Sequence, residues 1–192
     1  MTPRFPEFIE NIDLAILNFI QSFLTCPVMD AVMKFITHLG DEGIIWIIIA
    51  IILLIPKKTR KTGATVGVAL ILGLVLGNLV IKNIFGRMRP YTLENAVVKM
   101  PIIGEQSEFS FPSGHTRSSF EAAFVLLWAD KRMGIPAMIL AALIAFSRLY
   151  VYVHFPSDII GGILLGLFNA WLATFIVEKF CNKFGIGKKT AK

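Results

Sequence analysis

The sequence predicts an all-α membrane protein, folded as one integral bundle of about six transmembrane helices. Of its 192 residues, 55% are hydrophobic and 16 are phenylalanine, and the mean hydropathy is +0.70, which is more apolar than a soluble domain of this length. Apolar runs recur along the chain and are separated by charged or turn-forming residues. A span needs about 20 residues. Residues 1–192 therefore form a single membrane domain.

The first apolar region, residues 12–39, alternates apolar with polar residues and contains Pro27, which predicts either a kinked span or an interfacial helix followed by a short helix. The turn at 40–43, Gly-Asp-Glu-Gly, separates it from the next run. The later runs, each expected to be helical, are 43–55, 64–81, 120–129, 133–153 and 159–177. Of these, 64–81 and 159–177 are each long enough to span alone.

The distribution of lysine and arginine predicts the orientation, because positively charged loops stay in the cytoplasm. Basic residues occur at 57–61, at 131–132 and in the tail 179–192, which share one face if the helices alternate in direction. We therefore expect a multi-pass protein of the cell membrane with both termini in the cytoplasm. The net charge of +6 reflects this orientation and contact with anionic lipids, and gives no case for nucleic acid.

Four cations, Lys82, Arg87, Arg89 and Arg148, are expected on the opposite, outer face, where they work against the orientation rule. Lys82 ends one long apolar run, Arg89 follows seven residues later on the same face if the helix continues to Pro90, and Arg148 lies near the outer end of another run. A single such cation is usually an anchor to the lipid headgroups. Three of them on one face, together with two histidines, indicate a functional site.

The histidines stand at expected helix starts on that face. Ser113 and Gly114 supply a helix N-terminus, a ready anion site, with His115 in the first turn. His154 precedes a proline typical of a helix start, and Asp158 lies four residues on, within reach of the imidazole. His38 has no such partner and is expected to be a plain interfacial residue. The two cysteines form no metal-binding pattern, and no carboxylate cluster on this face looks like a magnesium site.

Three segments match a known signature. KNIFGRMRP at 82–90, PSGH at 112–115 and SRLYVYVHFPSD at 147–158 resemble the three-part signature of the type 2 phosphatidic acid phosphatase family, read as KxxxxxxRP, PSGH and SRxxxxxHxxxD. Every fixed position is present, in the family's order. The resemblance covers the helices of residues 62–178, whereas residues 1–60 carry no motif and resemble the family in length and hydropathy alone.

The resemblance implies a metal-independent phosphatase without a cofactor. It implies that His154 is a nucleophile that becomes a phosphohistidine, that Asp158 fixes its tautomer, and that His115 is the general acid. It also implies the phosphate-binding residues Lys82, Arg89, Ser113, Gly114 and Arg148, supported by Pro90, Pro112 and Ser147. We expect Ser147 to orient a cation. Arg87 and Arg117 lie beside signature positions, and surface or headgroup contact is the expectation for both.

The substrate implied is a lipid phosphate or diphosphate that enters from the bilayer, with its phosphate at an outward-facing site. Undecaprenyl diphosphate is slightly preferred by analogy, and phosphatidate or phosphatidylglycerophosphate are the alternatives. A soluble haloperoxidase shares a related site, but the spans argue against it. An inactive membrane scaffold or a transporter is the alternative of a different class, and the full set of His115, His154 and Asp158 argues against it. The signature leaves the oligomeric state open.

Overall fold

The computed structural model describes residues 5–106 and 108–184, and these contain helices and loops but no β-strand. The α-helices, in chain order, are α1 (Glu7–Phe23), α2 (Pro27–Leu39), α3 (Ile44–Leu54), α4 (Arg60–Gly73), α5 (Lys82–Phe85), α6 (Gly114–Ala129), α7 (Lys131–Tyr150) and α8 (Pro156–Lys183). Two 3-10 turns, η1 (Asp41–Gly43) and η3 (Pro90–Thr92), and a π-helical stretch, η2 (Leu74–Ile81), complete the chain. The all-α prediction is confirmed.

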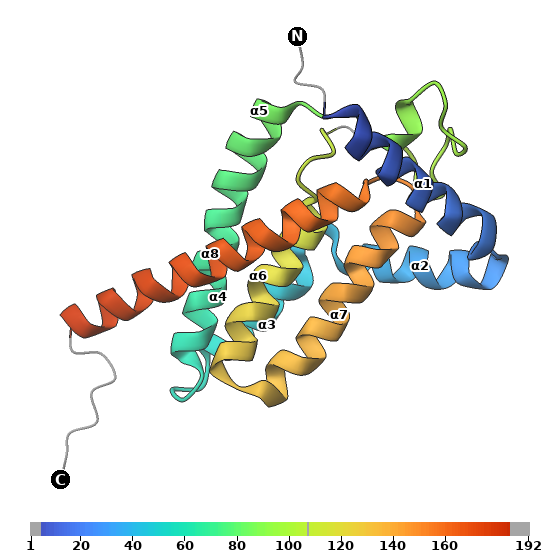
Figure 1. Cartoon of the computed structure of the whole chain (residues 1–192). Coiled ribbons are helices and arrows are strands. Elements are labelled where there is room, and N and C mark those ends of the chain that lie inside the picture. Colours follow the sequence, from blue (N-terminus) through green and yellow to red (C-terminus); the bar gives the residue numbers. More distant parts are fainter. Residues whose placement is uncertain (1–4, 107, 185–192) are drawn as a thin grey trace.

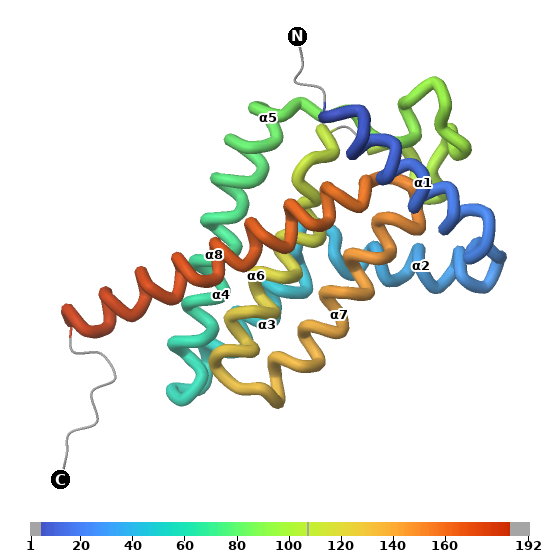
Figure 2. Tube along the Cα trace, viewed as in Figure 1, coloured from blue at the N-terminus to red at the C-terminus, as the bar shows by residue number. Residues whose placement is uncertain are grey.

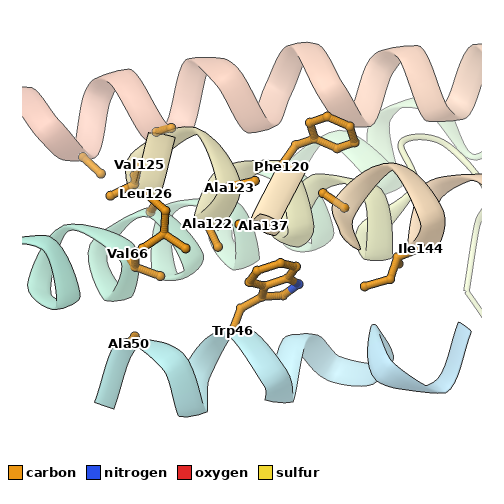
Figure 3. Close-up of a cluster of buried hydrophobic side chains, with 14 of the residues drawn as sticks. Trp46, Ala50, Val66, Phe120, Ala122, Ala123, Val125, Leu126, Ala137 and Ile144 are labelled. Atoms are coloured by element: carbon orange, nitrogen blue, oxygen red, sulfur yellow. The ribbon is translucent and has the colours of Figure 1, made fainter. Parts of the chain in front are cut away.

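Helix α6 lies at the centre of the bundle, with α4, α7 and α8 packed around it (Figure 1). Its burial explains its composition, because small residues such as Ala122 and Ala123 are fully buried and let the neighbouring helices approach closely. Trp46 of α3 lies beside these alanines in the buried cluster (Figure 3). Its indole Nε1 donates a hydrogen bond to Ser119 Oγ at 2.9 Å. The indole is therefore buried with its polar atom satisfied.

Within residues 5–106 and 108–184, three helical segments are long and apolar enough to cross a membrane: Arg60–Thr92, Lys131–Tyr150 and Pro156–Lys183. The described residues contain a fourth candidate span if α2 and the η1–α3 segment, which meet at a 42° bend, form one broken span. The large side chains on the outer surfaces of these helices, such as Ile139 and Leu164, are exposed, as expected for helices that face lipid tails. The chain is membrane-embedded, and six crossings remain a prediction.

The N-terminal region folds as two separate helices rather than as one kinked span. The chain reverses direction between α1 and α2 (Figure 2), and Pro27 begins α2 because a proline at the first helical position loses no hydrogen bond. Helices α1 and α2 have 17 and 13 residues, so each is shorter than the roughly 20 residues of a full span. Both pack against α7, next to the start of α8.

The long helix that begins at Arg60 runs through α4, η2 and α5 without a break and ends at Phe85. Gly86 ends it in the left-handed conformation, with φ of 52°, which glycine adopts at no steric cost. The expectation that Lys82 and Arg89 share one helical face is therefore wrong. Arg89 lies in extended backbone after the helix and reaches the same place as Lys82 by the course of the loop.

Candidate active site

The three signature segments converge on one cavity of about 720 Å³. Its polar end is formed by Lys82, Arg89, Gly114, His115, Arg148 and His154. From this polar end the cavity continues as a groove between α3 and α4, lined by apolar side chains such as Ile51, Val68 and Ile71. A compact polar end joined to an apolar groove suits a ligand with a charged head and a hydrocarbon tail.

The three predicted cations are buried around the polar end. Arg89 Nη1 donates to the Val153 carbonyl at 3.0 Å and lies 3.4 Å from His154 Nε2. Arg148 donates to Thr37 Oγ1 at 2.7 Å, while its Nε has no hydrogen-bond partner among the described residues. A buried guanidinium with an unused donor is available to an anionic ligand.

Lys82 forms an ion pair with Glu108, a residue of the loop before α6. The Lys82 side chain is buried, whereas that of Glu108 is 57% exposed. The hydrogen bond from Lys82 lowers the pKa of Glu108 below its ordinary value of 4.5, so the carboxylate is ionised at neutral pH. Glu108 thus forms an ion pair with the lysine that is predicted to bind phosphate. No sequence pattern indicated this contact.

His154 lies in the short loop between α7 and α8 and is 2% exposed. Its Nδ1 is 3.4 Å from Asp158 Oδ2, so the predicted pairing of the two side chains is present in space, although this atom makes no hydrogen bond. Burial, aided by the positive charges of Arg89 and Arg148, lowers the pKa of His154 well below its ordinary value of 6.5. The imidazole is therefore neutral at neutral pH, the form in which it is a nucleophile.

His115 lies in the first turn of α6, as predicted, and its Nε2 is 2.9 Å from Asp41 Oδ1. The other oxygen of Asp41 is 2.8 Å from His38 Nδ1. The expectation that His38 has no partner is wrong, because the turn at η1, where Glu42 has a φ of 51°, places Asp41 between the two imidazoles. The sequence placed Asp41 in a helix-breaking turn and gave no sign of this bridge.

The other predicted residues surround this arrangement. Ser113 is fully buried and caps α6, its hydroxyl accepting a hydrogen bond from Thr116 N at 3.4 Å, and it does not line the cavity. Pro112 and Pro90 are both buried. Pro112 lies just before α6, and Pro90 begins η3. Ser147 donates to the Ile144 carbonyl at 2.7 Å within its own helix. The hydrogen bonds of the described residues include none between Ser147 and a cation, so its role in orienting a cation stays a prediction.

Arg87 is buried at 5% exposure, and the expectation of a surface residue is wrong. Its Nη1 lies 2.7 Å from Asp158 Oδ1, and its Nη2 lies 2.7 Å from Asp13 Oδ2. Asp13 of α1 was not predicted as a site residue, although a signal existed. It lies at i, i+4 and i+7 spacing with Leu17 and Ile20, which form the buried face of α1.

Arg117 is also buried rather than in contact with headgroups, which corrects the second surface expectation. It bonds Glu121 Oε1 and Asn78 Oδ1, both at 3.2 Å, and Asn169 of α8 donates to the same Glu121 oxygen at 2.7 Å. These four side chains link η2, α6 and α8 in the interior. A charged group inside a membrane bundle needs such partners, because the lipid provides none.

Comparison with known proteins gives consistent matches. A sequence model described as PAP2 superfamily matches residues 62–180. An undecaprenyl-diphosphatase of Sulfolobus acidocaldarius is 36% identical over 151 residues, covering 78% of this chain and 70% of that protein. A lipid A 4'-phosphatase of Bacteroides thetaiotaomicron is 30% identical over 185 residues, covering 90% of this chain and 80% of that protein.

A solved structure agrees with these matches. The transmembrane PAP2 type phosphatidylglycerolphosphate phosphatase from Bacillus subtilis superposes with a TM-score of 0.68 at 28% identity, covering 97% of this chain and 90% of that chain. The superposition extends well beyond residues 62–180, so it includes the helices that carry no signature. The three proteins are all named as phosphatases of a phosphorylated lipid, and the lipid differs among them.

Proposed function

This chain belongs to the PAP2 superfamily, and from that membership we propose that it removes phosphate from a lipid phosphate or diphosphate through a phosphohistidine at His154. The observation that carries the proposal is the position of a buried, neutral imidazole at the polar end of a cavity that also contains Lys82, Arg89 and Arg148. A neutral nucleophile among cations suits attack on an anionic phosphoryl group.

In the first step, His154 Nε2 forms a bond to phosphorus as the bond from phosphorus to the lipid or diphosphate oxygen breaks, and His115 gives that oxygen a proton. In the second step, water attacks phosphorus, the bond to Nε2 breaks, and His115 takes the proton of the water. The three cations neutralise the phosphoryl oxygens as charge moves in each transition state. Asp158, 3.4 Å from Nδ1, stabilises the positive ring of the intermediate. None of these steps uses a metal ion.

We favour undecaprenyl diphosphate as the substrate, with phosphatidate and phosphatidylglycerophosphate as alternatives. The apolar groove supports a long hydrocarbon tail, because it follows α3, whose 11 residues extend over about 16 Å. The names of the relatives support a lipid substrate, since two of those compared are named for undecaprenyl diphosphate and for lipid A.

The test is phosphate release by the purified protein in detergent with EDTA, which silences contaminating metal-dependent phosphatases. The substrates are undecaprenyl diphosphate, phosphatidate and phosphatidylglycerophosphate, each compared with His154→Ala. We expect release that survives EDTA and falls by roughly 10³-fold or more in the variant. The surface variant Glu178→Gln is the control. Equal release by His154→Ala would refute the nucleophile, and no release from any lipid by the wild type would favour a scaffold or transporter.

The groove is tested separately with Gly67→Phe. Gly67 lines the groove, and an added Cβ there meets nothing within 4 Å, so a side chain at this position begins in open space within the groove. We expect a higher KM for the long-tailed lipids and an unchanged KM for a short-chain phosphate. An equal change for both would show that the tail lies elsewhere.

We further propose that the cavity faces outside and that the C-terminal end of α8 is cytoplasmic. The expectation of a cytoplasmic N-terminus does not fit this orientation, because Phe5 packs against Phe85 and Phe111 at the bundle end that carries the signature loops. The basic loop between α3 and α4 and the junction of α6 with α7 lie at the bundle end remote from the signature loops (Figure 1), which supports this orientation. Single cysteines at Glu94 and Lys58 in a cysteine-free protein test it with a membrane-impermeant maleimide on intact cells. Labelling at 94 and not at 58 is expected, and the reverse would invert the topology.

A further inference from the structure

Asp158 is held by a buried ionic network that extends beyond the signature. Arg87 Nη1 lies 2.7 Å from Asp158 Oδ1, and Arg87 Nη2 lies 2.7 Å from Asp13 Oδ2. Ser157 closes the network, because its backbone N–H donates to Asp13 Oδ1 at 2.9 Å and its hydroxyl contacts both Asp13 and Arg87. Asp13, Arg87 and Asp158 are at most 5% exposed, so water does not screen these contacts.

The network fixes the orientation of the Asp158 carboxylate. Oδ1 is taken by Arg87, while Oδ2 accepts a hydrogen bond from Phe155 N at 2.8 Å and lies 3.4 Å from His154 Nδ1. The guanidinium of Arg87 stacks on the Phe155 ring at 3.9 Å, which prevents it from rotating. The orientation of the Asp158 carboxylate toward His154 is therefore held by the guanidinium of Arg87, and the position of that guanidinium is held by Asp13.

The charge of the network also matters. One guanidinium serves two buried carboxylates, so Asp13, Arg87 and Asp158 together carry a formal charge of −1, which partly offsets the cations Arg89 and Arg148 near His154. If Arg87 were paired with Asp158 alone, the two charges would cancel. Because Asp13 shares the guanidinium, the network as a whole stays negative, which favours the positively charged imidazole ring of the intermediate.

We infer that Asp13 and Arg87 are positioning residues for the pair of His154 and Asp158, so that helix α1 takes part in the reaction without touching the substrate. This inference rests on the function proposed above. A purely structural network would lower the amount of folded protein and leave the folded fraction with normal kinetics. A positioning network lowers kcat in protein that is fully folded.

The experiment compares Asp13→Asn, Arg87→Lys and Ser157→Ala with the wild type. Asn keeps the shape of Asp and removes its charge, and Lys keeps the charge of Arg but cannot bond both carboxylates. Ser157→Ala leaves all three charges in place and is the variant least disturbing to folding. The matched control is Asp30→Asn, since Asp30 is also an N-terminal carboxylate and accepts a hydrogen bond at 2.6 Å from Tyr150 of α7, without a link to Asp158.

For protein that elutes as a single species and melts normally in detergent, we expect kcat to fall about 10- to 100-fold in Asp13→Asn and Arg87→Lys, as for carboxylates that orient metal-bound imidazoles. KM is expected to change little in these variants. The kcat of Ser157→Ala is expected to fall less than that of Asp13→Asn or Arg87→Lys. Asp30→Asn is expected to match the wild type. If the wild type is active and Asp13→Asn and Arg87→Lys match Asp30→Asn, the inference is wrong and the proposed function stands.

Orthovanadate binding gives a readout that does not depend on turnover, because vanadium accepts an imidazole nitrogen as a ligand. We expect calorimetry to show weaker binding of vanadate to Asp13→Asn and Arg87→Lys than to the wild type and Asp30→Asn. If no lipid is hydrolysed by the wild type, the proposed function fails, and the vanadate ranking alone decides the inference. Equal affinities across all variants would overturn it.

Discussion

The imidazole Nε2 of His115 lies 2.9 Å from Oδ1 of Asp41, and the opposite oxygen of the same carboxylate lies 2.8 Å from His38 Nδ1. One carboxylate thus bridges a histidine of the cavity whose side chain is 18% exposed and a histidine whose side chain is 52% exposed. The bridge fixes the ring of His115 and leaves Nδ1 as the ring nitrogen not used by Asp41. It also gives His115 a partner for the positive charge that the ring carries when protonated.

We predict that Asp41→Asn lowers kcat about tenfold on a lipid phosphate, because His115 loses the partner that stabilises its protonated form. The loss is expected to be smaller on an aryl phosphate, whose leaving group departs without a proton. Steady-state kinetics on the two substrates provide the measurement. An equal loss on both would show that Asp41 supports the fold of the site rather than the proton transfer.

We predict that Glu108→Gln lowers KM for a lipid phosphate two- to fivefold, since the carboxylate competes for Lys82 with a strength of at most about 1 kcal/mol for a half-exposed pair. The pKa of Glu108 is lowered from 4.5 by Lys82, so this competition is present at all pH values above 4.5 and is lost as the pH falls through the lowered pKa. The difference in KM should therefore be constant between pH 5 and 8.

Glu105→Gln is the control for this experiment, because it removes the same charge from the same loop at an exposed position. An equal drop in KM for the two variants would show a general effect of loop charge. It would leave no specific role for the contact between Glu108 and Lys82.

We predict that His154 stays neutral as the pH falls below 6.5, because burial and the nearby guanidinium groups lower its pKa. The chain has three histidines, so ¹⁵N-histidine labelling in micelles gives few signals, and the signal lost in His154→Gln identifies this one. A midpoint for His154 at or above 6.5 would contradict the burial seen here.

We predict that Gly73→Ala destabilises the protein by roughly 1–3 kcal/mol, the usual cost of overpacking. An added Cβ at Gly73 would overlap Arg117 Nη1 and Glu121 Oε1, the ion pair at the centre of the bundle. Gly67→Ala in the same helix is the control, because its Cβ meets nothing within 4 Å and alanine favours a helix. Melting temperatures in detergent measure both. Equal melting of the two variants would show that the helices move apart freely.

The sequence was sufficient to predict which residues gather at the cavity, because the fixed positions of the signature stand at helix ends that share one face. Lys82, Arg89, Arg148, His115 and His154 all line the cavity. The path by which they meet could not be predicted in the same way. Gly86 ends the helix in a left-handed conformation before Arg89, and a glycine in a sequence does not state the sign of its φ.

The partners of the site residues were less predictable than the residues themselves. Arg87 and Arg117 stand beside fixed positions, and a pattern does not say whether a long cation points outward to the headgroups or inward to a carboxylate. Arg87 points inward because Asp13 of α1 binds it there, and Arg117 points inward because Glu121, one turn later in α6, does the same. The bridge between His38 and His115 depends on the unusual backbone of η1, which sequence periodicity does not encode.

Three residues of the signature, His115, Arg148 and Asp158, share one further property. Asp158 is linked through Arg87 to Asp13, His115 to Asp41, and Arg148 to Thr37, and all three of these partners precede residue 62, where the match to the superfamily begins. Helices α1 and α2 and the η1 turn, which carry no signature position, therefore supply partners to signature residues without lining up as reacting groups themselves. We expect an exchange of these helices between two relatives with the same signature to change the rate of turnover, although every reacting group stays the same.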